Sequence, residues 1–202
     1  AVGSNAKRGV DFRYSCMTNP LRILGIDPGL NTTGYAAIEA HSTGPKLLEA
    51  GVLSSDESKS AENLPQRLKA LYDGVLEVID QFHPGVLSVE QLYAHYEHPR
   101  TAILMGHARG AILLAGAQRG LQVVSYASTQ IKKTITGSGR ASKEQMQMAM
   151  LREFRLKAMP EPHDVADALA IALCHYYASS NSQAGGTSVG VRLSALDPDT
   201  TS

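Results

Sequence analysis

The chain has 202 residues, 43% of them hydrophobic, and can bury the core of one globular domain without disulfides. Its 19 basic and 19 acidic residues cancel, which alone argues weakly against a nucleic-acid-binding protein. No apolar run approaches the ~20 residues of a membrane span. The two cysteines lie far apart in the sequence and favour a reducing compartment over a disulfide framework.

The chain divides by composition into three parts. Residues 1–16 lack the apolar segment of a secretory signal, and Met17 directly precedes the first predicted strand. Residues after 179 are rich in Ser, Gly and Thr. We therefore expect a flexible leader over 1–20, one domain over 21–179 and a flexible tail over 180–202.

The first half of the domain predicts strands and then a long helix. Short apolar runs between turn signals predict strands over 21–27, 34–40 and 47–54, the last reached through the loop Ser42-Thr43-Gly44-Pro45. Apolar residues then recur at helical spacing over 61–82, and His83-Pro84-Gly85 ends that helix.

The second half alternates strands and helices. We predict a strand over 86–90, a small-residue helix over 101–119 capped by Gly120, a strand over 121–126 and a helix over 128–135. A further helix starts at Ser142 with Gln145 as its capping-box partner, and an alanine-rich helix covers 162–178. This order predicts an α/β fold whose sheet is antiparallel at its start and parallel later.

Four carboxylates fall at the ends of these elements. Asp27 and Glu90 end two strands that we expect to be parallel neighbours, and Asp164 and Asp167 share one helix face because they are three residues apart. Each acid alone has an ordinary alternative, such as a turn residue, an exposed strand end or a charge at a helix start. Together, in this element order, they predict one acidic cluster.

Such a cluster suits divalent metal ions. Mg²⁺ prefers oxygen ligands, and two ions ~4 Å apart can activate water and stabilise a leaving oxygen in phosphodiester hydrolysis. Asp27, on a buried strand, is our candidate for the acid shared by both ions. His163 beside Asp164 is either a helix-start residue or a proton donor.

Positive charge is concentrated between residues 119 and 157, where eight basic residues face only two acids. The eight are Arg119, Lys132, Lys133, Arg140, Lys143, Arg152, Arg155 and Lys157. A basic block opposite a carboxylate cluster is typical of a protein that holds an anionic polymer over metal ions. The ordinary alternative is a solvated helix face.

Several separated motifs occur in the order of one known family. They are Gly25-Ile26-Asp27-Pro28-Gly29, Thr33-Gly34-Tyr35, Val89-Glu90-Gln91 with Tyr93, Gly106-His107-Ala108-Arg109-Gly110, Gln130-Ile131-Lys132, Thr136-Gly137-Ser138-Gly139 and Asp164-Val165-Ala166-Asp167-Ala168-Leu169-Ala170. Over about residues 21–178 the chain resembles the RuvC family of Holliday-junction resolvases. The resemblance implies a ribonuclease-H-like fold, a mixed five-stranded sheet flanked by helices, and Mg-dependent paired nicking of four-way junction DNA in recombination and repair.

The resemblance also implies residue roles and partners. Asp27, Glu90, Asp164 and Asp167 would be the catalytic, metal-binding acids, holding two Mg²⁺ per subunit, with Mn²⁺ as a substitute. Tyr93, Lys132, Arg140 and Lys143 would contact DNA. The helix with Gly106 and Gly110 would form a homodimer, through its small residues Ala102, Gly106, Ala108, Gly110, Ala111 and Ala115. The family further implies a cytoplasmic protein with RuvA and RuvB as partners.

Departures and rival interpretations remain. The segment 95–100 differs from the family stretch, and the neutral charge is low for it. Another ribonuclease-H-like nuclease, acting on RNA–DNA hybrid or pre-ribosomal RNA, would use the same acids. An inactive junction-binding module would keep the fold, whereas an ATP-binding protein of the actin and sugar-kinase type needs two such domains.

Overall fold

The computed structural model describes residues 20–54, 64–92, 99–158 and 161–184. It contains five strands in the order β3-β2-β1-β4-β5. These are β1 (Arg22–Asp27), β2 (Thr32–His41), β3 (Gly44–Ser54), β4 (Val86–Glu90) and β5 (Gln122–Tyr126). β1, β2 and β3 pair antiparallel, whereas β1–β4 and β4–β5 pair parallel, which confirms the predicted mixed sheet.

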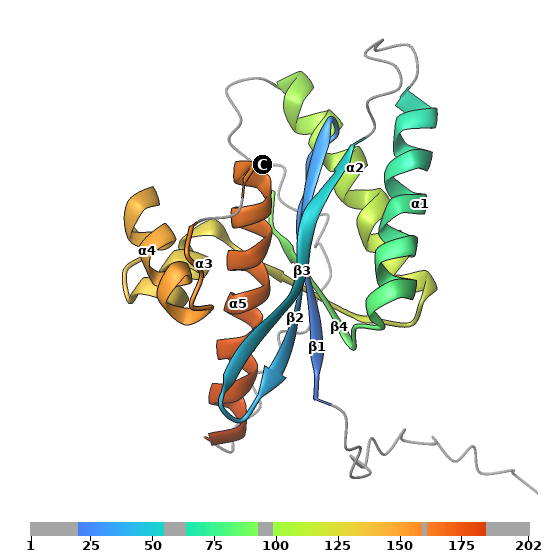
Figure 1. The fold of residues 1–202 in the computed structure, drawn as a ribbon. Helices are drawn as coiled ribbons and strands as arrows, with labels where there is room; N and C mark the ends of the chain where they lie inside the picture. Colours follow the sequence, from blue (N-terminus) through green and yellow to red (C-terminus); the bar gives the residue numbers. More distant parts are fainter. Residues whose placement is uncertain (1–19, 55–63, 93–98, 159–160, 185–202) are drawn as a thin grey trace, which may run out of the picture.

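Helices cover both faces of this sheet (Figure 1). On one face lie α1 (Leu64–Phe82) and α2 (Pro99–Gln118), and on the other lies α5 (His163–Ala184). Outside α5, at the left of Figure 1, are α3 (Ser128–Thr136) and α4 (Lys143–Glu153). None of the helices in the described ranges is long and apolar enough to cross a bilayer.

The two faces of β1 follow from its alternation. Leu24 and Ile26 are fully buried in the core under α1 and α2, and Ile23 is fully buried in the core under α5. Gly25 also faces α5, because a Cβ there would lie 2.3 Å from the carbonyl oxygen of Ala168. Since side chains alternate along a strand, Asp27 points to the α5 side.

The alanine-rich helix packs closely on the sheet, as predicted. A Cβ on Gly25 would meet the Ala172 Cβ at 2.8 Å, whereas ordinary contact begins at 3.4 Å. Only glycine on the strand and small residues on α5 allow this approach. The α5 backbone is thus held directly against the central strand.

Several element ends differ from the predictions by one to three residues, among them the starts of β2 at Thr32 and of α2 at Pro99, and the end of α5 differs by more. β3 begins at Gly44 and includes Pro45, although the sequence predicts a loop there; proline fits because β3 is an edge strand of the described sheet. α5 continues to Ala184 rather than ending at 178, so the tail predicted from residue 180 is helical at its start. The hydroxyls of Ser179 and Ser180 donate to the Tyr176 carbonyl, which accommodates these serines in the helix. Residues 1–19 and 185–202 lie outside the described residues.

Candidate active site

The carboxyl ends of β1 and β4 bring two of the predicted acids to one edge of the sheet. Ile26 pairs with Val89 in the parallel ladder, and Asp27 and Glu90 are the next residue on each strand. Ser88, two residues before Glu90, donates its hydroxyl to the Ile171 carbonyl on α5 at 3.2 Å. Glu90 therefore points to the α5 side, as Asp27 does.

The first turn of α5 brings the other two acids to the same place. Gly34 on β2 is the register partner of Asp27, and a Cβ on Gly34 would lie 1.9 Å from the carbonyl oxygen of Asp164. The helix start thus lies against the strand next to Asp27. Asp167 follows within one turn on the same face of α5.

The acids interact electrostatically. Burial, followed by the charges of Asp167, Glu90 and Asp164, raises the pKa of Asp27 from 3.8 to about 8. Repulsion among nearby carboxylates and loss of solvent both favour the neutral form. The structure therefore places all four predicted acids in one cluster, centred on Asp27.

Glu90 and Asp167, unlike Asp27, interact with groups that lower the pKa of a carboxyl. Burial raises the pKa of Glu90 and the charge of Asp167 adds to this, whereas a hydrogen bond from Ser128 and the charge of Lys132 oppose it. Burial also raises the pKa of Asp167, opposed by Lys143, His163 and Lys132. Asp167 is nonetheless solvent-exposed, because its side chain lines an open pocket.

That pocket, of ≈ 280 Å³, joins the acids to two predicted basic residues. Glu90 and Asp167 line it together with Lys132 on α3 and Lys143 at the start of α4. Its apolar walls come from Ile131, Met146, Met150, Ala166, Ala170 and Ile171. The capping box predicted for Ser142 and Gln145 is present and fixes the helix start that carries Lys143.

The donor set fits a hard divalent cation. Carboxylate oxygens are the ligands Mg²⁺ and Mn²⁺ prefer, and a cation would offset the repulsion that raises the pKa of Asp27. Within the described ranges, no three His, Cys, Asp or Glu side chains lie close enough to hold one metal ion as they stand. The four carboxylates thus lie near enough at the sheet edge to raise the pKa of Asp27, but no three of them are close enough to bind one metal ion without moving.

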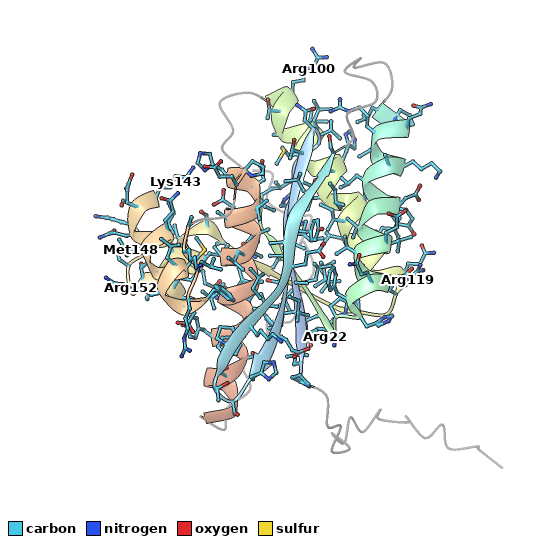
Figure 2. The ribbon with its side chains drawn as sticks, viewed as in Figure 1. Arg22, Arg100, Arg119, Lys143, Met148 and Arg152 are labelled. Atoms are coloured by element: carbon cyan, nitrogen blue, oxygen red, sulfur yellow. The ribbon has the colours of Figure 1, made fainter. Side chains whose placement is uncertain are left out.

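The basic block is not one surface. Figure 2 shows Lys143 and Arg152 on α4 at the left of the molecule and Arg119 on the opposite side of the sheet. Arg119 donates to both carboxylate oxygens of Asp80 on α1, at 2.7 and 2.6 Å. The prediction was therefore wrong for Arg119. Arg119 precedes β5 and the cations of α3 and α4 follow it, so residues that are close in sequence lie on opposite sides of the sheet.

Of the other two residues predicted to contact DNA, the structure describes Arg140 but not Tyr93. Arg140 lies exposed between α3 and α4, where its main-chain N–H donates to the Ser138 hydroxyl at 3.3 Å; it does not line the pocket. Tyr93 and most of the divergent segment 95–100 lie outside the described residues. His163 is exposed at the first position of α5.

Helix α2 presents two distinct faces. Ala108, Ile112 and Ala115 are fully buried in the core, so some of the predicted small residues serve internal packing. A Cβ on Gly106 or Gly110 would meet nothing within 4 Å. On that same face, Ile103 is 61% and Leu114 59% exposed. The second face is open and apolar.

Sequence reasoning missed two residues that contact Glu90. Ser128, which starts α3, donates its hydroxyl to the Glu90 carboxylate. Arg109 on α2 donates from Nε to the Glu90 carbonyl at 3.1 Å. Arg109 stands in the Gly106–Gly110 motif of the sequence, but nothing in that motif connects it with Glu90.

Comparisons with known proteins point to one family. A family profile described as crossover junction endodeoxyribonuclease RuvC matches residues 23–175. A protein of that name from Rhodopirellula baltica is 50% identical over 159 residues, covering 79% of this chain and 88% of its own. One from Hydrogenovibrio crunogenus is 42% identical over 154 residues, covering 76% and 86%.

Solved structures show the same relationship. The structure of Thermus thermophilus RuvC superposes with a TM-score of 0.71 at 31% identity, covering 80% of this chain and 97% of that one. The same protein in complex with Holliday junction substrate gives 0.73 at 31% identity, with 80% and 96% coverage. The yeast mitochondrial Holliday junction resolvase Ydc2, at 14% identity and a TM-score of 0.59, shares the fold.

Proposed function

The chain belongs to the RuvC family of crossover junction endodeoxyribonucleases, and on that premise we propose how its own residues cut a four-way DNA junction. The protein is a phosphodiester hydrolase that resolves Holliday junctions in recombination and repair. The observation that carries the proposed mechanism is the acidic cluster at the ends of β1 and β4 and the start of α5.

We assign the cluster the role of metal-binding, catalytic site. Asp27 lies on the central strand, and the charges of the other three acids all raise its pKa. We therefore assign it as the acid that two ions would share. Glu90, Asp164 and Asp167 supply the remaining carboxylates. Two divalent ions, Mg²⁺ or Mn²⁺, supply an activated water and stabilise the leaving oxygen when bound.

Lys132 and Lys143 hold the backbone of the cleaved strand in this proposal. Both line the pocket that Glu90 and Asp167 also line, so a phosphate bound to them lies beside the acids. Phosphate contacts fix register without reading bases, which suits an enzyme that selects a branched shape. Arg140 is exposed nearby and extends this surface, and we keep Tyr93 as a base-stacking residue by family resemblance.

The open face of α2 supports a homodimer. Gly106 and Gly110 leave room for another backbone, and Ile103 and Leu114 supply exposed apolar area beside them. Two copies are what paired, symmetric nicking requires. By resemblance we also propose RuvA and RuvB as partners, the cytoplasm as the compartment, and a nuclease domain over 21–179 that α5 extends to Ala184.

A nicking assay tests the mechanism. Purified protein with Mg²⁺ meets a labelled mobile four-way junction, a linear duplex and an RNA–DNA hybrid of related sequence. We expect paired symmetric cuts in the junction, abolished by Asp27→Asn with junction binding retained. Asp73→Asn on α1, an exposed carboxylate paired with Lys69, is the matched control and should cut normally.

Each other outcome contradicts part of the proposal. Full activity of Asp27→Asn would remove the acidic cluster from the mechanism. Preferential cutting of the hybrid would indicate a different ribonuclease-H-like nuclease. Tight junction binding without cutting in either metal would indicate an inactive binding module.

A further inference from the structure

Arg109 joins α2 to the two strands that end at the site. Its Nε donates to the main-chain carbonyl of Glu90 at 3.1 Å, and its Nη2 donates to the Ser125 hydroxyl on β5 at 2.8 Å. The side chain is half-buried. Both of these acceptors are neutral, whereas a guanidinium that has lost part of its solvent is usually paired with a carboxylate.

The position of Arg109 relative to the Glu90 carboxylate decides how it can act. Val89 pairs with Ser125, and Glu90 pairs with Tyr126, in the β4–β5 ladder. Val89 packs in the core on the α1–α2 side, so Arg109 reaches the strands from the face opposite the acids. It therefore contacts the backbone that carries the Glu90 carboxylate rather than the carboxylate itself.

The chemistry of the guanidinium explains why an arginine suits this place. Burying a charge is costly, and charge-assisted hydrogen bonds offset part of that cost. The planar fork also fixes two acceptors relative to each other, which a flexible ammonium does not do. The main chain at Gln91 is tied down as well, since its N–H donates to the Tyr126 carbonyl at 2.9 Å.

We propose that Arg109 is a positioning residue for junction cutting: from α2 it fixes the main chain of Glu90, and with it the place of the Glu90 carboxylate among the acids. The inference rests on the proposed metal-binding role of Glu90. It assigns no contact between Arg109 and DNA or metal. It gives α2, whose opposite face is open, a direct connection to the site.

Metal binding without DNA tests this role apart from cutting. We would titrate the intact protein with Mn²⁺ and follow free ion by electron paramagnetic resonance. Arg109→Met should weaken Mn²⁺ binding by roughly 10–100-fold, the usual effect of removing a group that orients a metal ligand. Arg109→Lys should fall between Arg109→Met and wild type, because it keeps the charge and loses the fork. Arg119→Met, an arginine just past α2 in an exposed ion pair, should bind Mn²⁺ normally.

A double-mutant cycle separates positioning from general loss of structure. In a Glu90→Gln background, Arg109→Met should change Mn²⁺ affinity by less than about twofold, since the residue it positions is already altered. Single-turnover cutting by Arg109→Met should fall with metal affinity, while junction affinity in Ca²⁺ stays close to wild type. If Arg109→Met does not fold, Ser125→Ala, which removes one acceptor, should show a smaller loss with the same dependence on Glu90.

The outcomes distinguish this inference from the proposed function. Wild-type Mn²⁺ affinity in Arg109→Met, or in a folded Ser125→Ala used in its place, would overturn the inference. An equal loss of Mn²⁺ affinity in the wild-type and Glu90→Gln backgrounds would overturn it as well. If wild type fails to cut junctions while the cycle shows coupling, the proposed function falls, whereas the positioning of the Glu90 carboxylate for metal binding stands. If wild type cuts and the cycle shows no coupling, only the positioning role falls.

Discussion

Replacing Gly34 by alanine should disable the site without touching any acid. A Cβ at this position would lie 1.9 Å from the Asp164 carbonyl oxygen and 2.3 Å from its carbonyl carbon. Both atoms belong to helix backbone, which cannot rotate out of the way as a side-chain end does. Because ordinary contact begins at 3.4 Å, the first turn of α5 must move by about 1.5 Å or the strand must yield.

The magnitudes follow from this clash. Overpacking of this kind costs about 1–3 kcal/mol of unfolding free energy. A 1 Å displacement of catalytic groups can cost about 100-fold in rate, so we expect at least that loss in single-turnover junction cutting. Junction affinity should change little, because Lys132 and Lys143 lie on α3 and α4.

The assay compares cutting rate, junction affinity and thermal unfolding in Gly34→Ala and a matched glycine variant. Gly74→Ala on α1 is suitable, because the three atoms nearest to a Cβ there all belong to the Leu53 side chain, the nearest at 3.3 Å. It should keep full activity and equal or slightly higher stability, since alanine favours the helix. A Gly34→Ala enzyme that cuts at the wild-type rate would refute the idea that this contact sets the position of Asp164 and Asp167.

Two further predictions concern charge. In metal-free protein the pKa of Asp27 is about 8 in the folded state and 3.8 in the unfolded chain. Between pH 4 and pH 8, roughly, the folded state therefore holds a proton that the unfolded chain has released. The contribution of Asp27 to stability should therefore be fully present below about pH 4 and be lost as the pH rises toward 8. Asp27→Asn should accordingly unfold at a higher temperature than wild type at pH 8, with the difference shrinking toward pH 4, by calorimetry in chelator. Parallel pH profiles for the two proteins would contradict this. Changing Lys132 and Lys143 together to alanine should weaken junction binding and reduce the slope of log affinity against log salt by about 1.8, from ~0.9 per phosphate contact. Lys69→Ala on α1, paired with Asp73, is the control, and an unchanged slope in the double variant would exclude the two lysines from the DNA surface.

Much of the fold and the acidic cluster could be predicted from sequence because local signals and long-range packing agree. Asp27 and Glu90 each end an apolar run, so their place at a sheet edge follows once the strands are parallel neighbours. The alanines of α5 predict close packing on the sheet. The capping box at Ser142 is a local motif and was confirmed at its predicted residues.

The rest depended on contacts that sequence spacing does not encode. Arg109 and Ser128 reach Glu90 across the sheet edge, one from each side, and no local pattern joins them to it. Gly34 begins a predicted strand, and no local pattern shows that the Asp164 backbone lies against it. Arg119 belonged to a basic stretch by sequence, yet Asp80 pairs with it on the other side of the sheet.

The place of β1 in the sheet has a consequence for how the molecule opens. β1 is hydrogen-bonded on both sides, to β2 and β4, whereas β3 and β5 stand at the two ends of the strand order. Amide protons of β1 should therefore exchange with solvent only in the rarest, most global openings, after those of β3 and β5 have exchanged. The main chain that carries Asp27 thus belongs to the slowest-exchanging part of the protein, and fraying at the sheet edges leaves that acid in place.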